Sequence, residues 1–150
     1  MEGLTFLLQT FVSTLASMMV GFLWHSELLF GRSWWRNTFP GIRFGDTKLF
    51  KEAGNFPLYM TMIVTIIQNI VLTYVINTLY PLLVQTTGDG VFFPAACSVV
   101  ISIILSCVIF PHFVYSRKPF VLYLIAAGHN VFQTTAAIFV IYYLIATGKD

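Results

Sequence analysis

The chain alternates long apolar segments with short clusters of charged residues. Charged side chains are absent from residues 3–26, 53–88, 90–116 and 119–148. A helix that crosses the hydrocarbon of a bilayer needs about 20 mostly apolar residues, and each stretch is long enough. Because Pro81 and the polar residues 85–90 interrupt the longest stretch, we expect it to hold one span. The pattern predicts four transmembrane helices, at about 4–26, 57–80, 91–114 and 119–146.

Five of the six prolines agree in position with these spans. Pro57, Pro94 and Pro119 lie where helices are expected to begin, a position that proline tolerates because its missing N–H has no partner there. Pro81 is expected to end the second helix, and Pro111 to kink or end the third from inside. The expected architecture is an all-α membrane protein with four helices in an up-down bundle.

Composition excludes most other classes of protein. The 150 residues are 57% hydrophobic and only 9% charged, whereas a soluble domain carries about 25% charged residues. A disordered chain would be polar and poor in aromatic residues, but 17% of this chain is aromatic. The length predicts a single transmembrane domain over residues 1–150.

The basic residues are concentrated in two connections, which predicts the orientation of the chain. They are Arg32, Arg36, Arg43, Lys48 and Lys51 after the first span, and Arg117 and Lys118 after the third. The positive-inside rule places both connections in the cytoplasm, or in the mitochondrial matrix, with both termini on the outer side. The expected location is the mitochondrial inner membrane or the plasma membrane.

The inner connection over residues 31–56 is the only sizeable segment expected outside the membrane. Within it, Asp46 is suited to cap a short helix over 47–53 that ends at Gly54. Because Leu49 and Phe50 are apolar neighbours, this helix is expected to lie on the membrane surface.

Two sequence motifs resemble a known family. Residues 21–34 read GFLWHSELLFGRSW, and residues 116–129 read SRKPFVLYLIAAGH. Both are similar to signature segments of the family called domain of unknown function 1761, although His25 stands where that family more often has tyrosine. The resemblance implies a small four-helix membrane protein and implies no activity.

Small and polar residues recur every four positions along three of the predicted spans. They are Ser13, Ser17, Gly21 and His25 on the first, Thr61, Thr65, Asn69, Thr73 and Asn77 on the second, and Ser98, Ser102 and Ser106 on the third. Residues four apart share one face of a helix. These faces suit close packing between membrane helices, and the alternative is a polar path for an ion or small solute.

Five polar residues are expected near the bilayer midplane, at about 15–21 Å from the inner ends of their helices. They are Gln68, Asn69, His129, Asn130 and Gln133. A histidine inside the membrane is a candidate proton relay or ligand. The alternative is a structural one, in which a neutral His129 bonds to Asn69 or Gln68 and fixes the bundle.

A second candidate site lies at the inner membrane face and would bind anionic phospholipid. Its residues are Arg32, Arg36, Trp34, Trp35, Arg117 and Lys118. Basic pockets between helices on this side hold the head groups of anionic lipids, and tryptophan favours the headgroup level. The alternative is that these charges set the topology and remain solvated.

Motifs for other chemistry are absent from the sequence, which favours a non-catalytic protein. It has no phosphate-binding glycine loop, nucleophile elbow or zinc-protease motif, and no pattern typical of nucleic-acid binding. Cys97 and Cys107 lie about 15 Å apart along one predicted helix, so they cannot form a disulfide. His25 and His112 would have to face each other across the bundle to ligate a haem, and we expect no cofactor or metal.

Two functions fit these observations. The first is a small accessory subunit that packs against other subunits of a larger membrane complex, such as a respiratory assembly. It fits the short connections and the absence of a catalytic motif. The alternative is a small transporter or channel that uses the midplane polar residues.

Overall fold

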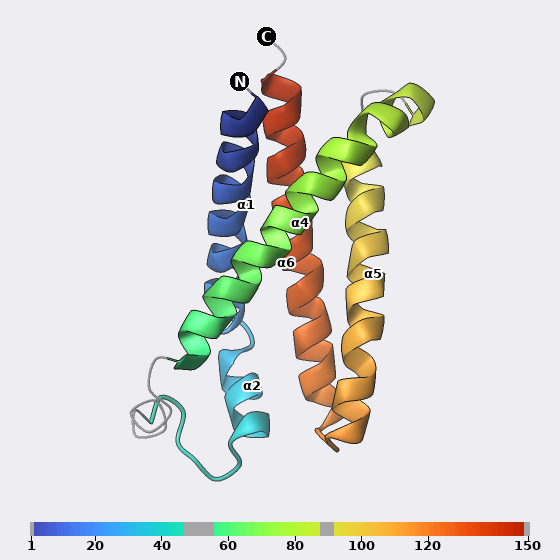
Figure 1. Ribbon diagram of the computed structural model, residues 1–150. Coiled ribbons are helices and arrows are strands. Elements are labelled where there is room, and N and C mark those ends of the chain that lie inside the picture. The colour runs from blue at the N-terminus through green and yellow to red at the C-terminus, as the bar shows by residue number, and fades with distance from the viewer. Residues whose placement is uncertain (1, 47–55, 88–91, 149–150) are drawn as a thin grey trace.

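The computed structural model describes residues 2–46, 56–87 and 92–148, and this part of the chain contains five helices and no strand (Figure 1). They are α1 (Glu2–Trp24), α2 (Gly31–Thr38), α4 (Phe56–Thr87), α5 (Phe92–Tyr115) and α6 (Phe120–Thr147). All but α2 are long and apolar enough to cross a membrane. The prediction of an all-α protein with four apolar spans is confirmed, and these four helices are those of an integral membrane protein. The expected helix over 47–53 lies outside the described residues.

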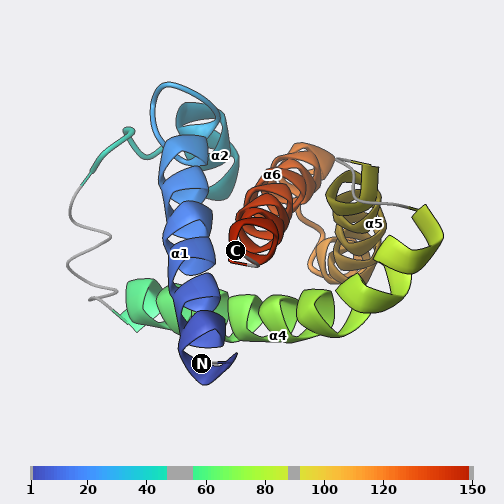
Figure 2. The same ribbon diagram turned by 90° about the horizontal axis from the view of Figure 1, so that it is seen from above.

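Helix α6 is the centre of the arrangement. It packs against α1 on one side and α5 on the other, while α4 crosses obliquely and contacts α1, α6 and α5 (Figures 1 and 2). The start of α1 and the end of α6 lie at one end of the molecule, and α2 and the α5–α6 turn lie at the other (Figure 1). The two motifs of the sequence therefore belong to helices that are direct neighbours.

The interior of this fold is unusually polar and its outer surface is apolar. Large side chains such as Leu4, Phe11 and Met19 are more than half exposed on α1. The buried polar residues are Gln9, Thr10, Ser13, Thr14, Ser17, Thr65, Asn69, Thr73, Ser98, Ser102, Gln133 and Thr134. In a bilayer, helices gain from close packing of small and hydroxyl-bearing faces, because lipid already solvates apolar side chains. The polar stripes of the sequence lie mainly between helices.

A smaller apolar core joins α4 to α6 in the half nearer the termini. Its buried members are Leu72, Ile76, Ala137, Ile138 and Ile141. Beyond it, the rings of Tyr80, Phe93 and Tyr142 contact one another and bring in the start of α5. This cluster fixes the end of the molecule at which α4 and α5 approach each other.

Helix α4 does not end at Pro81, so that expectation is wrong. The helix continues to Thr87, and Figure 2 shows that its last part bends. Proline removes one helical N–H, and its ring clashes with the preceding turn. A helix can therefore either end at a proline or bend there and continue. Pro111 likewise lies inside α5, four residues before its end.

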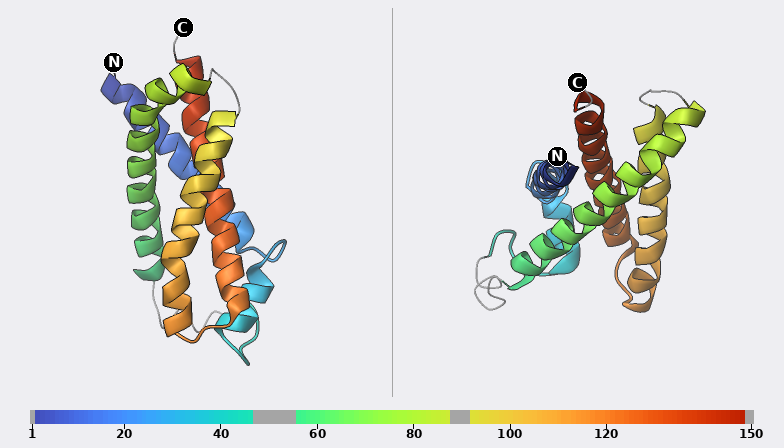
Figure 3. Two further views of the ribbon diagram at one scale, coloured as in Figure 1. Left: turned by 90° about the vertical axis from the view of Figure 1, so that its right-hand side faces the viewer. Right: turned by 45° about the horizontal axis from the view of Figure 1, so that its top comes forward.

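The sequence pattern did not predict helix α2. Its presence changes where the residues of the first motif lie along α6. Helix α1 ends at Trp24, and α2 then packs beside the first turns of α6 (Figure 3). Consequently His25 lies against His129, which is about 13 Å along α6 from Phe120. His25 therefore does not lie level with the first turns of α6, because α2 occupies that level instead.

Candidate functional site

The two sequence motifs meet at the contact between the end of α1 and the first half of α6. The indole Nε1 of Trp24 donates a hydrogen bond to the carbonyl oxygen of Ile125 at 3.0 Å. Trp24 is buried, although it lies at the end of a helix whose outer face is exposed. The bond joins residues that are 101 positions apart, so it fixes the register of α1 along α6.

Glycine at position 128 makes this contact possible. A Cβ added to Gly128 would lie 2.8 Å from Cζ2 of Trp24, closer than real Cβ atoms approach their neighbours. The indole ring therefore lies directly on the backbone of α6. Gly21 has a related role on α1, because a Cβ there would lie 3.2 Å from Nε2 of His129.

Two imidazole rings face each other next to this contact. The ring centroids of His25 and His129 are 5.1 Å apart. Nε2 of His129 is buried and has no hydrogen-bond partner among the described residues. Partial burial lowers the pKa of His25, which therefore favours the neutral imidazole.

Aromatic side chains adjoin the two imidazoles and the Trp24 ring. Phe30 and Phe132 lie against Trp24 with centroid distances of 4.5 and 5.2 Å, and Trp34 lies 5.4 Å from His25. Within the described part of the chain, no group of three or more His, Cys, Asp or Glu side chains is close enough to hold a metal ion. The histidine pair is thus a contact within a tight aromatic cluster.

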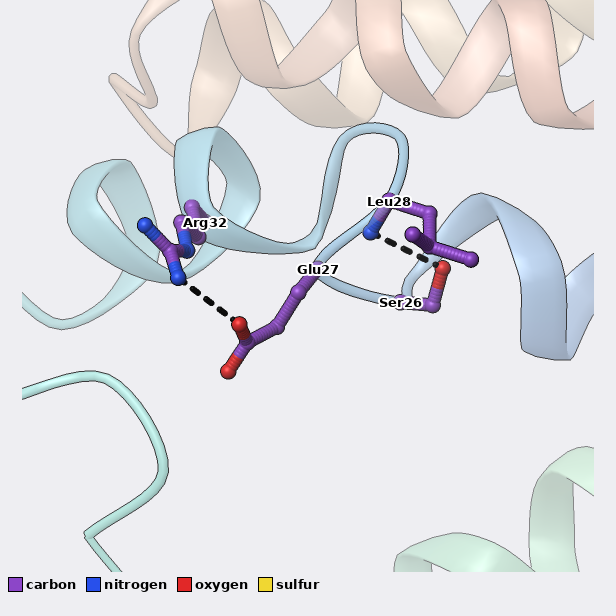
Figure 4. Close-up of polar contacts among 4 residues, drawn as sticks. All are labelled: Ser26, Glu27, Leu28 and Arg32. Atoms are coloured by element: carbon purple, nitrogen blue, oxygen red, sulfur yellow. Dashed lines mark hydrogen bonds and ion pairs between the residues drawn. The ribbon is translucent and has the colours of Figure 1, made fainter.

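The chain turns sharply between the histidine pair and α2. Oγ of Ser26 donates to the Leu23 carbonyl at 2.6 Å. The same atom accepts the backbone N–H of Leu28 at 3.3 Å (Figure 4). Gly31 ends the turn, and a Cβ at this position would collide with the His25 carbonyl. Glycine is required at position 31 because two backbone segments touch there.

The five predicted midplane residues have different neighbours. Asn69 bonds across to Ser17 of α1, with Nδ2 3.2 Å from Oγ, and donates to the Thr65 carbonyl at 2.9 Å. His129 instead faces His25. Gln133 is buried, whereas Gln68 and Asn130 are half-buried. The partner of Asn69 is a residue of the small-residue stripe on α1.

A second polar pair repeats this contact between α1 and α4. Nδ2 of Asn77 donates to Oε1 of Gln9 at 2.8 Å, two helical turns from Asn69. Several other buried hydroxyl oxygens of the helices have no partner in the described residues. They belong to Thr10, Thr14, Thr73, Ser102 and Thr134.

The basic residues predicted to bind lipid do not all line the same cavity. A cavity of about 450 Å³, called here the arginine cavity, is lined by Glu27, Arg32, Trp35, Arg36, Phe39, Gly41, Ile42, Arg43 and Phe44. Lys118 lines a separate cavity of about 210 Å³ with Trp34. Arg117 lines neither of these two, and it has a positive φ of 52° in the α5–α6 turn. Arg43 joins the cavity, a grouping that the sequence pattern did not indicate.

One arginine of the arginine cavity has an acidic partner. Nη2 of Arg32 lies 2.7 Å from Oε2 of Glu27, and both side chains are more than half exposed (Figure 4). An exposed ion pair contributes little to stability, about 0–1 kcal/mol. The pair matters here because it neutralises one of the three arginines.

The two histidines considered for haem ligation belong to different parts of the fold. Helices α1 and α5 lie on opposite sides of α6 (Figure 2). His25 follows α1 and has His129 as a ring neighbour, whereas His112 is an exposed residue of α5. Cys97 and Cys107 are both free. The arrangement of these four residues adds no support for a haem or a disulfide.

A comparison with known families identifies one match over most of the chain. The family model described as "Protein of unknown function (DUF1761)" matches residues 8–142, which include both motifs. No curated protein and no solved structure matches the chain.

Proposed function

The chain belongs to the DUF1761 family of proteins of unknown function, and we propose that it is a non-catalytic accessory subunit of a larger membrane assembly. In this proposal its helices form an up-down bundle with both termini on the outer side. The arginine-rich connection then faces the cytoplasm or the mitochondrial matrix, in accordance with the positive-inside rule.

The observation that carries the proposal is an apolar groove between α4 and α5. The two helices diverge from their contact near Tyr80 and Phe93 (Figure 1), and a cavity of about 360 Å³ lies beside that contact. It is lined by Val75, Ile76, Leu79, Phe92, Phe93, Ala96, Cys97, Val100 and Ile101. No charged side chain is among these residues, so the groove suits another apolar surface.

The occupant that we propose is a transmembrane helix of another protein. The α5 side of the groove offers Ala96 and Cys97, and small residues let a second helix approach closely. Only 22% of the residues in the apolar window of α5 are buried within the chain, the lowest value of the four spans. Helix α5 therefore has the most surface left for a partner.

Transport is a second candidate function, and one observation favours it. Buried hydroxyls from α1, α4, α5 and α6, together with Nε2 of His129, have no partner within the described residues. Buried polar atoms normally have one, so these atoms suit a polar occupant. Proton flux into vesicles that contain the purified protein tests this function: equal flux for the native chain and His129→Leu excludes His129 from a proton path.

Site-specific photo-crosslinking in the native membrane tests the accessory function. A photoreactive residue in place of Val100 lies in the groove, and one in place of Met19, on the outer face of α1, is the matched control. We expect the groove position to crosslink to another protein and the complex to comigrate with a large particle in mild detergent. Lipid adducts alone at position 100, with the chain migrating as a monomer or small oligomer, would overturn the proposal.

A further inference from the structure

The arginine cavity is built by a loop that folds back onto α2. The indole Nε1 of Trp35 donates to the carbonyl of Ile42 at 3.1 Å, and Phe39 and Phe44 lie 5.1 and 5.5 Å from the Trp35 ring. Gly41 has a φ of +84°, a conformation that favours glycine and allows the chain to reverse. These contacts place Arg43 on the same cavity as the two arginines of α2.

The charge of the cavity is unbalanced. Three arginines line it with one carboxylate, and that carboxylate belongs to Glu27, which pairs with Arg32. Arg36 and Arg43 make no ion pair with any residue that the structure describes. Asp46 lies with Arg43 on a neighbouring cavity and not on this one. Two guanidinium groups are thus available, and their planar donors match the oxygens of a phosphate.

We propose that the arginine cavity binds the phosphate of an anionic phospholipid, with Arg36 and Arg43 as its charged contacts. A basic pocket at this membrane face is the kind of site that holds an anionic headgroup.

The apolar surroundings favour a lipid over a soluble phosphate compound. Trp35, Phe39 and Phe44 line the cavity with the arginines, and aromatic rings favour the headgroup level of a bilayer. Leu28 and Leu29, which precede α2, are 84% and 54% exposed and adjoin Glu27 in the chain. A ligand with a phosphate and acyl chains satisfies both features, whereas free phosphate uses only the charges.

Native mass spectrometry of the full chain tests the proposal, with phosphatidylglycerol and phosphatidylcholine as the lipid probes. We expect the native chain to retain phosphatidylglycerol in preference to phosphatidylcholine. The double variant Arg36→Gln/Arg43→Gln is expected to lower the affinity for phosphatidylglycerol about tenfold or more. Arg117→Gln is the control for a positive charge removed outside the cavity, and we expect a change of less than about twofold.

A gain-of-binding variant keeps the test valid if the double variant fails to fold. Glu27→Gln frees Arg32 from its ion pair, so we expect tighter binding of phosphatidylglycerol. Equal losses in the double variant and in Arg117→Gln would overturn the site, as would no change in either. Displacement of the bound anion by millimolar inorganic phosphate would overturn its assignment as a lipid.

Discussion

Helices α1 and α6 pack in a different way from helices α4 and α5. The contact of Trp24 with Ile125 and Gly128, between α1 and α6, is called here the seam. Along the seam, Trp24 lies directly on the backbone of Gly128, and its N–H bonds to the backbone of Ile125. The α4–α5 pair meets through rings near one end, and an apolar groove lies between the helices. The seam holds both family motifs, whereas the groove lies outside them.

This difference shows what holds helices together where water is absent. Apolar side chains such as Val100 and Ile101 gain little by leaving lipid, so they do not draw α4 and α5 together. Close backbone approach and hydrogen bonds between helices do provide attraction, and Gly128 and Trp24 supply both. The seam is therefore expected to carry more of the stability per residue than the open pair.

The largest expected effect comes from adding a methyl group to the seam. Gly128→Ala places a Cβ against the Trp24 ring, and overpacking of this kind costs about 1–3 kcal/mol. Thermal unfolding in mild detergent measures the loss as a lower midpoint. Gly3→Ala is the matched control, since nothing lies within 4 Å of a Cβ at that position, and its midpoint should not fall. Equal midpoints for the two variants would contradict a tight seam.

An intermediate effect is expected from the polar contact between α1 and α4. Asn69→Leu removes the bond to Ser17, and such bonds in membrane proteins contribute about 0.6 kcal/mol, with a maximum of about 1.7. Val100→Ala, on the open pair, is the comparison, because its exposed side chain packs against little of the chain. We expect Asn69→Leu to lower the unfolding midpoint more than Val100→Ala does. The reverse order would show that the groove residues contribute more than the polar stripe.

The smallest expected effect is a dependence of stability on pH. Burial lowers the pKa of His25 below its ordinary value of 6.5, so the unfolded chain takes up a proton first as the pH falls. Stability from this residue is therefore present above about pH 6.5 and is lost as the pH falls below that value. The titratable group facing His25 from α6 is His129, and the α2 residue facing it is Trp34.

Midpoints of unfolding measured between pH 8 and pH 5 test this dependence. We expect the decline in the native chain to be shallower in His25→Gln, because glutamine does not take up a proton in this range. A profile that His25→Gln leaves unaltered would show that protonation of this ring is not the cause.

The apolar runs of the sequence were sufficient to predict the four long helices, because each run is long enough to cross the hydrocarbon core of a bilayer. The family was also recognisable, since residues 21–34 and 116–129 carry its motifs and its model matches residues 8–142. The four-residue spacing of Ser17 and Asn69 within their stripes indicated which faces pack. It could not indicate that these two residues are partners.

Contacts between residues far apart in the chain could not be predicted from the sequence, because the spacing of polar and apolar residues describes one helix at a time. The contact of Trp24 with Gly128 depends on where α1 ends relative to α6. Arg43 was not included in the predicted lipid site, and its place in the arginine cavity depends on the Trp35–Ile42 hydrogen bond. Pro81 was expected to end a helix, although a kink satisfies the same steric constraint.

A double-mutant cycle tests most directly whether Trp24 and Gly128 form the contact that joins the two motifs. The variants are Trp24→Phe, Gly128→Ala and both together, and the measurement is the free energy of unfolding of each in mild detergent. Because a smaller ring leaves room for the added methyl group, Gly128→Ala should cost at least about 0.5 kcal/mol less in the Trp24→Phe background than in the native chain. Costs that add within about 0.3 kcal/mol would contradict the contact.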